Sequence, residues 1–404
     1  MIDLLLRGCR LPDREGVADV GIAEGRIVAV GVVDQRARET VEVRGRLVTP
    51  GLVEAHIHLD KALLMGRVRG SAGTLEEAIR LTGEAKRGFT VEDIRTRARQ
   101  VLDLAVAAGT TAMRSHVEVD PIVGLAGMAA VLPLKGEYAP ALDLQICAFA
   151  QEGILQAPGT EALLRQALQM GADLVGGVPY NDTDPVKHIE IVFSLAREFD
   201  VDADFHVDFF DEPEHLHIRE IAKQTVRAGW HGRVAVGHLT ELAALPPRGQ
   251  DAVIADIVTA GIGVISLPAT DLYLIARLTP IRRLLAAGVP VALATNNVRN
   301  LFTPVGTADL AHMAFLAAVA AHMGTSTQMR ELVATLTTLP ARILRLRDYG
   351  LAVGCRADLL VWECERPEEI VAAVPPRSLV VKNGRVTIEH ERRRREVWRR
   401  REGL

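Results

Sequence analysis

Short apolar runs alternate with helix-like segments through the middle of this chain, and that alternation restricts the folds open to it. Continuous apolar runs of about four to eight residues are typical of buried parallel strands. They fall near residues 52–58, 111–119, 142–150, 173–179, 201–207, 233–238, 262–267 and 290–295. Helical periodicity separates them, most clearly over 91–108, 161–170, 185–199 and 213–228. Eight strand–helix repeats predict an α/β fold, the (β/α)8 or TIM barrel.

The two ends of the chain carry a different pattern. Short strand-like pieces broken by glycine and charge occupy residues 3–7, 17–22, 26–30 and 40–43 near the beginning. Similar pieces return at 358–362 and 378–382, and Asn383-Gly384 after them is a strong hairpin signal. We therefore predict a small composite β-sandwich from residues 1–47 and 346–390. The barrel would span 48–345, and a basic tail would span 391–404.

The composition fits this architecture and argues against several classes of protein. Hydrophobic residues make up 49% of the chain but aromatic residues only 4%, so Ala, Val, Leu and Ile must build the core. With 47 basic and 51 acidic residues, no nucleic-acid-binding surface is expected. No apolar run approaches the ~18 residues of a membrane span, and we see no signal-peptide pattern. The 4 cysteines are scattered, which favours reduced thiols and a cytoplasmic location.

Polar side chains gather at the predicted strand ends, where a TIM barrel carries its active site. The first strand ends in His56-Ile57-His58, and residues two apart on a strand point to the same face, so both imidazoles can approach one ion. Further histidines stand at other strand ends: His116, His206 and His238. Gln151, Tyr180 and Asn297 stand at such ends as well. The pattern predicts a metal-centred site, with His116, Gln151, Tyr180 and Asn297 as candidate substrate contacts.

The same strand ends carry a family resemblance that covers nearly the whole chain. Its carriers include 53–61 (VEAHIHLDK), 114–120 (RSHVEVD), 144–153 (LQICAFAQEG), 171–179 (GADLVGGVP), 206–208 (HVD), 237–238 (GH), 302–306 (FTPVG) and 354–359 (GCRADL). The chain resembles the amidohydrolase superfamily, in its cytosine deaminase-like branch, which includes N-isopropylammelide amidohydrolase. The resemblance implies a hydrolase that cleaves a C–N bond of a small nitrogen heterocycle, by deamination or amide hydrolysis.

The resemblance also implies roles for particular residues. His56, His58 and His206 would hold one divalent metal ion, which could be zinc, iron or manganese. Gln151 would recognise the amide edge of the substrate, and His238 would polarise the attacked group. The chemistry is consistent, because three neutral imidazoles leave an open position where bound water falls from a pKa of ~15.7 to about 7. A small-molecule heterocycle is then the expected partner, and a homo-oligomer is an expectation at the level of the family.

Two positions depart from the family pattern. Asn296 stands where the family places a strand-8 aspartate, although it stays in our predicted ligand set, and Phe209 stands where cytosine deaminases carry a glutamate. Candidate substitute carboxylates near strand ends are Asp208, Asp211, Glu212, Glu118 and Asp60. Asp208 lies two residues beyond His206 and could replace the missing carboxylate, or it could merely cap a helix. His238 or Lys61 could handle protons instead, Lys61 only if burial or a nearby cation lowers its pKa. The alternative is a non-hydrolytic protein that binds a small heterocycle.

Overall fold

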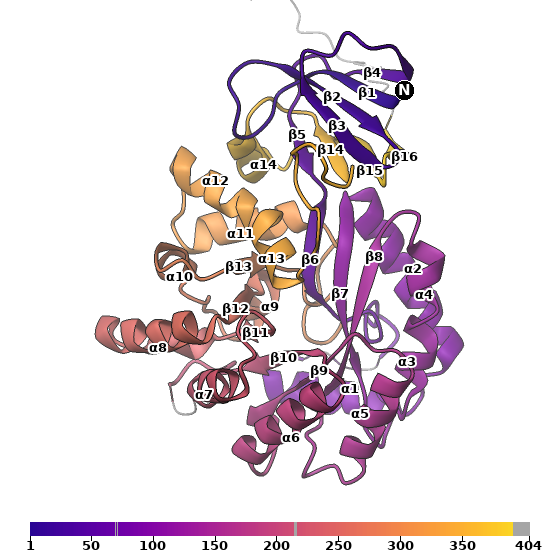
Figure 1. The fold of residues 1–404 in the computed structure, drawn as a ribbon. Coiled ribbons are helices and arrows are strands. Elements are labelled where there is room, and N and C mark those ends of the chain that lie inside the picture. Colours follow the sequence, from indigo (N-terminus) through magenta and orange to yellow (C-terminus); the bar gives the residue numbers. More distant parts are fainter. Residues whose placement is uncertain (69, 71, 214–215, 391–404) are drawn as a thin grey trace, which may run out of the picture.

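The computed structural model describes residues 1–68, 70, 72–213 and 216–390, and the predicted basic tail over 391–404 lies outside them. Figure 1 shows two parts, a small β-rich unit at the top and a larger unit of strands surrounded by helices. The small unit contains both the beginning and the end of the described chain. The larger unit contains everything between them.

The larger unit is the predicted (β/α)8 barrel. Its strands pair in sequence order in one parallel sheet, β6 (Leu52–Ile57), β7 (Thr110–Glu118), β8 (Asp143–Ala150), β9 (Leu174–Gly177), β10 (Asp202–Val207), β11 (Val234–His238), β12 (Gly263–Ser266) and β13 (Val291–Leu293). The barrel closes just beyond β13, where Asn296 N donates to His56 O and His58 N donates to Asn296 O, both at 2.9 Å. The closing hydrogen bonds thus flank the two histidines of the first strand.

Helices lie outside the strands (Figure 1). They are α1 (Leu75–Lys86), α2 (Val91–Ala107), α3 (Ala126–Val131), α4 (Leu134–Tyr138), α5 (Thr160–Gln169), α6 (Pro185–Glu198), α7 (Ile218–Ala228), α8 (Pro247–Ala260), α9 (Pro268–Leu274), α10 (Ile281–Ala286), α11 (Leu310–Ala320), α12 (Ser326–Ala334) and α13 (Thr338–Ile343), with the short 3-10 helices η1 (Pro179–Asn181) and η2 (Thr240–Ala244). Local sequence explains their starts, since Thr90 caps α2 and Asp184 caps α6 through side-chain hydrogen bonds. The helix predicted over 213–228 begins only at Ile218.

Small side chains fill the barrel interior on the side away from the strand ends. Val53, Ala55, Ala112, Ala235 and other residues of the strands form one buried apolar cluster. The helix α13 and the residue after it contribute Ala341, Ile343 and Leu344 to the same cluster. This packing closes one end of the barrel, so only the opposite end, where the strands finish, is left for chemistry.

The small unit is a pair of four-stranded sheets. One contains β1 (Ile2–Cys9), β2 (Ala18–Ala23), β3 (Arg26–Gly31) and β4 (Ala37–Glu42), and the other contains β5 (Val48–Pro50), β14 (Leu359–Trp362), β15 (Arg377–Lys382) and β16 (Arg385–Glu389). Both sheets contribute to one apolar core, for example Leu6 and Ile22 from the first and Leu359 and Val381 from the second. The helix α14 (Pro367–Ala373) connects β14 to β15. Because β5 pairs with β14, this unit takes in three residues that our prediction assigned to the barrel.

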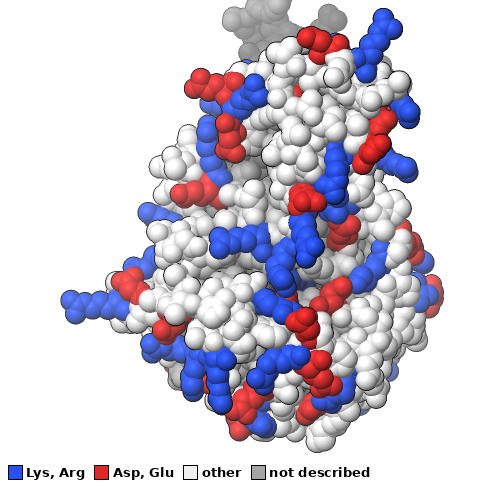
Figure 2. Space-filling view, viewed as in Figure 1, with Lys and Arg blue, Asp and Glu red and all other residues white. Residues whose placement is uncertain are grey.

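A buried lysine joins the two units. Lys382 Nζ at the end of β15 donates to Thr111 O in β7 at 3.1 Å and is paired with the carboxylates of Asp143 and Asp358 at 2.7 and 2.8 Å. On the outer surface, Lys and Arg are interspersed with Asp and Glu over the face shown in Figure 2. Among the described helices, none has the length and apolar character that crossing a membrane requires.

Candidate active site

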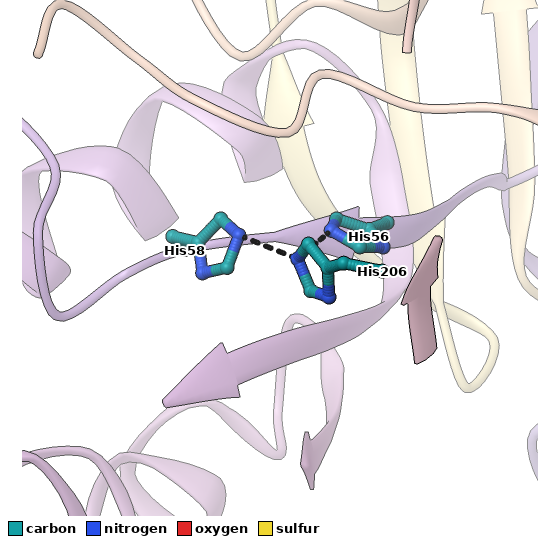
Figure 3. A group of neighbouring side chains, drawn as sticks. All are labelled: His56, His58 and His206. Carbon is teal, nitrogen blue, oxygen red and sulfur yellow. Dashed lines mark hydrogen bonds between the residues drawn. The ribbon is translucent and has the colours of Figure 1, made fainter. Parts of the chain in front are cut away.

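Three imidazoles converge at the C-terminal ends of two barrel strands (Figure 3). His56 is the second-last residue of β6, and His58 comes directly after that strand. His206 lies in β10, on the other side of the barrel mouth. The Nε2 atom of His206 lies 3.0 Å from Nε2 of His56 and 3.1 Å from Nε2 of His58. All three side chains are buried. Such a set of nitrogens pointing at one place is the arrangement of a metal centre.

The three histidines are held in the neutral form that binds metal. Burial lowers the pKa of each well below its ordinary value, and neighbouring histidines add to the effect. His58 Nδ1 lies 3.2 Å from the carbonyl oxygen of His116, which can only accept, so Nδ1 carries the proton and Nε2 keeps its lone pair. A single proton on His206 Nε2 cannot bridge both of its neighbours. A cation at this point satisfies all three nitrogens.

Asn296 completes the surroundings of the three imidazoles. Its backbone pairs with His56 and His58 across the barrel closure, and its φ of 57° is in the left-handed region that asparagine tolerates better than most residues. Within the described residues, its buried Oδ1 has no hydrogen-bond partner. A buried acceptor without a partner is costly, and a cation bound by the neighbouring imidazoles could supply that partner. The residues present therefore fit a divalent metal.

A buried carboxylate, that of Glu54, holds the strand that carries His56 in place. Glu54 accepts from Thr295 Oγ1 at 2.7 Å and from the backbone N of His56 at 3.1 Å, so it joins β6 to the segment that carries Asn296. Burial raises the pKa of Glu54 to about 7, although these hydrogen bonds oppose the shift. Gly237 makes room for the ring of His56, since a Cβ there would lie 2.9 Å from its Cε1 atom.

His238, at the end of β11, has a carboxylate partner that the sequence did not indicate. Its Nδ1 atom lies 2.7 Å from Asp271 Oδ1 in α9. The ring of Phe209 stacks on the imidazole with a centroid separation of 3.8 Å. The centroid of His238 lies 5.6 Å from that of His206, so it stands beside the three imidazoles. The residue predicted to polarise the substrate is thus in the site and is firmly oriented.

Gln151, directly after β8, lies next to a chain of buried charges. Lys61 Nζ donates to Gln151 Oε1 at 3.2 Å and to Glu118 Oε1 at 2.6 Å. Lys86 lies 2.8 Å from the other oxygen of Glu118 and pairs with two more carboxylates, those of Asp120 and Glu152. Burial alone would raise the pKa of Glu118, but the ammonium groups of Lys61 and Lys86 overcome it and lower the pKa to about 2. An ammonium only donates, so Lys61 fixes the orientation of the Gln151 amide.

Asp208 and Lys61, our two alternative proton carriers beside His238, both have close polar partners. Asp208 accepts from the backbone N of His217 at 2.8 Å and of Ile218 at 3.1 Å, so its carboxylate holds the start of α7. This is the helix-cap alternative, and it also explains why α7 begins at Ile218. Lys61 is buried and donates to the carboxylate of Glu118 at 2.6 Å, so its ammonium group is held in an ion pair.

The other predicted substrate contacts, His116, Asn297 and Tyr180, have different neighbours in the structure. His116 stacks on His56 at a centroid distance of 3.9 Å and lies 3.3 Å from a carboxylate oxygen of Asp204, so it packs behind the metal site. Asn297 is buried, and its amide is held by Thr270 and Asn300. Tyr180 in η1 packs edge-on against Phe210, with ring centroids 5.2 Å apart.

Two carboxylates of the site were absent from our sequence prediction, Asp271 and Glu54. Glu54 could have been found, because it is two residues before His56 and the period of a strand places both on one face. Asp271 gave a weaker signal, since it lies on a helix about one turn past the seventh strand rather than at the strand end itself. Its contact with His238 depends on how α9 docks against the barrel.

Comparison with known proteins identifies relatives along the whole length. A sequence model described as the Amidohydrolase family matches residues 39–388. N-isopropylammelide isopropyl amidohydrolase of Pseudomonas sp. (strain ADP) is 30% identical over 402 residues, 96% of this chain and 98% of that protein. The crystal structure of 5-methylcytosine deaminase from Klebsiella pneumoniae with 5-fluorocytosine has a TM-score of 0.93, 27% identity, and coverage of 97% of this chain and 99% of its own.

A second structural neighbour agrees with the first. N-isopropylammelide isopropylaminohydrolase from Burkholderia multivorans superposes with a TM-score of 0.88 at 30% identity, covering 96% of this chain and 99% of its own. These proteins span both the sandwich and the barrel. The similarity therefore includes the strand ends that carry the site.

Proposed function

Because this chain belongs to the amidohydrolase family, in its cytosine deaminase-like branch, we propose that it is a metal-dependent hydrolase of small nitrogen heterocycles. The reaction would cleave a C–N bond, either by removing an exocyclic amine or by hydrolysing a cyclic amide or amidine. Relatives named as a deaminase and as an amidohydrolase of such rings support this class of substrate.

One observation carries the proposal, the convergence of the Nε2 atoms of His56, His58 and His206. We propose that these three residues and Asn296 hold one divalent ion, zinc, iron or manganese. When bound, such an ion supplies Lewis-acid chemistry and makes water nucleophilic near neutral pH. Burial of the imidazoles keeps them unprotonated and therefore available as ligands.

Gln151, Lys61 and His238 would position the ring. The contact from Lys61 Nζ occupies one side of the Gln151 amide oxygen, so the Nε2 group of Gln151 is turned away from Lys61 and can donate to the substrate. We assign to Lys61 the role of orienting Gln151, either from behind or while it also touches the substrate. We assign to Asp208 the role of capping α7. Once it has taken up a proton on Nε2, His238, beside His206, would polarise the attacked group. His116 would support His56, while Asn297 and Tyr180 would line the mouth.

Metal content and turnover test this proposal together. We expect the purified protein to hold about one equivalent of metal. His206→Ala should lose it, while His312→Ala, at an exposed position of α11, should keep it. Release of ammonia or alkylamine should be measured with cytosine, 5-methylcytosine and N-isopropylammelide. A protein that stays metal-free after reconstitution and still binds one of these rings would be the non-hydrolytic alternative, which the presence of Asn296 and Phe209 in place of carboxylates favours.

We further propose that the protein works in the cytoplasm as a homo-oligomer. All four cysteines are unpaired, as expected in a reducing compartment. The homo-oligomer is an expectation for the family. Light scattering on the purified protein as it elutes from a size-exclusion column tests it directly. A strictly monomeric protein at micromolar concentration would contradict it.

A further inference from the structure

The imidazole of His238 is held on several sides. Asp271 Oδ1 lies 2.7 Å from Nδ1, and Phe209 covers one face of the ring. The backbone of His238 is in the left-handed region with a φ of 72°, and its carbonyl accepts from the hydroxyl of Thr279. A histidine in this conformation is strained, and such strain persists where the surrounding structure fixes it for a purpose.

The surroundings of Asp271 decide which nitrogen of His238 carries the proton. Asp271 Oδ2 accepts from the backbone N of Leu267 at 3.1 Å, while Oδ1 faces His238 Nδ1. An ionised carboxylate only accepts, so the hydrogen bond to Oδ1 requires the proton on Nδ1. In the neutral ring the lone pair is then on Nε2, the nitrogen opposite Asp271. The pair has the geometry of a base and the carboxylate that orients it.

We propose that Asp271 is a positioning residue that fixes the Nδ1–H tautomer of His238 and so makes Nε2 the proton acceptor of the reaction. This inference rests on the proposed function. It gives the chain a proton carrier in place of the carboxylates that the family pattern has at Asn296 and Phe209. A water O–H bond breaks as the new C–O bond forms, and its proton goes to Nε2. His238 then passes that proton to the leaving nitrogen as the C–N bond breaks.

The first test is the tautomer itself, and it needs no substrate. Protein labelled with 15N-histidine should show His238 protonated at Nδ1 in long-range 1H–15N spectra, with the signal assigned by its loss in His238→Gln. In Asp271→Asn the backbone N of Leu267 should hold the new amide oxygen, which turns the NH2 group toward His238 Nδ1 and forces the proton onto Nε2. His188, whose Nδ1 lies 2.8 Å from Asp182, is an internal reference that should not change.

The second test is kinetic and uses whichever of cytosine, 5-methylcytosine and N-isopropylammelide the wild type hydrolyses. Asp271→Asn should lower kcat by about 10²- to 10⁴-fold, the usual contribution of acid–base catalysis, while KM changes little. Asp271→Ala should lose a similar factor and recover part of it in formate, which can replace the missing carboxylate. Metal content of both variants should equal that of the wild type.

The two arms separate the possible failures. A wild-type spectrum with the proton on Nε2 overturns the inference about Asp271, whatever the activity. An inverted tautomer with unchanged kcat overturns the role of His238 as proton acceptor. If no probe is hydrolysed by metal-loaded wild type, the proposed function fails, and the tautomer still decides what Asp271 does to His238.

Discussion

Phe209 lies flat against His238, with the ring centroids 3.8 Å apart and the planes inclined by 28°. Both rings are buried at the mouth of the barrel. In the resemblance, position 209 is where cytosine deaminases carry a proton-shuttling glutamate. Here an apolar ring covers one face of the imidazole and fixes its plane, while the lone pair and the N–H of the ring lie in that plane and are not covered by the stack.

Replacing Phe209 by leucine should weaken catalysis more than it weakens the fold. Leucine keeps most of the apolar volume but loses the ring stack, which is worth about 0.5–1.5 kcal/mol. We expect kcat to fall roughly two- to tenfold on a hydrolysed probe. Phe193→Leu is the matched control, because Phe193 is equally buried and packs on Phe205 away from the site. Equal kinetic effects of the two variants would contradict a role for the stack.

Asn296→Asp should strengthen metal binding. The substitution replaces a neutral oxygen that has no partner in the described part of the chain by an anionic ligand. We expect the metal affinity, measured in competition with a chelator, to rise at least ~10-fold. Changes to the groups that hold the metal ligands typically have effects of this size. Asn297→Asp is the control, since that amide is already held by Thr270 and Asn300. No change in metal affinity at position 296 would mean that Asn296 does not face the ion.

Lys61→Met should impair substrate binding through Gln151. The variant loses the donor to the Gln151 oxygen and frees the amide to rotate, which we expect to raise KM about tenfold, the worth of one well-placed hydrogen bond. Lys382→Met is matched, because Lys382 is also buried and paired with carboxylates, but at the junction of the sandwich and the barrel. It should lower the free energy of unfolding and leave KM unchanged. A KM equal to that of the wild type in Lys61→Met would contradict a role for Lys61 in substrate binding.

Glu118 should make the stability of the protein sensitive to acid. Its pKa is about 2 in the folded protein against an ordinary value of 4.5, so it stabilises the fold fully above pH 4.5 and loses this effect as the pH falls toward 2. The contribution is of the order of 3 kcal/mol, since each unit is worth about 1.4 kcal/mol. Denaturant unfolding should show a shallower fall of the free energy of unfolding below pH 4.5 in Glu118→Gln. Parallel curves for the two proteins would contradict the assignment.

The barrel could be predicted from the sequence because each of its strands is a short apolar run. The observed strand β10, for instance, begins one residue later than the predicted run over 201–207, and β6 and β8 agree with their predicted runs to within one residue. The gathering of histidines at the strand ends followed from the strand period and the common direction of parallel strands, and the family resemblance singled out His56, His58 and His206 among them. These are properties of local sequence, which is why they could be anticipated.

The contacts of Lys61 and Asp271 could not be predicted, and for Asp208 the sequence left two alternatives open, for three different reasons. Asp208 has a φ of 49° after its strand ends, so the strand period no longer governs where its carboxylate points. Lys61 meets Glu118 through the stagger between β6 and β7, which the sequence of neither strand reveals. Asp271 reaches His238 across 33 positions through the docking of α9. Pairings of this kind depend on tertiary geometry.

The composite sandwich can be completed only late in the synthesis of the chain, because three of the four strands of its second sheet come from the far end of the sequence. Trp362 Nε1 donates to Thr49 Oγ1 at 2.8 Å across 313 positions of the chain, and β5 pairs with β14, which is made long after it. At about 5–20 residues per second, a ribosome needs on the order of tens of seconds to make the intervening barrel. During that interval the apolar face of the first sheet cannot pack on the second sheet, which leaves the nascent chain open to aggregation at that face.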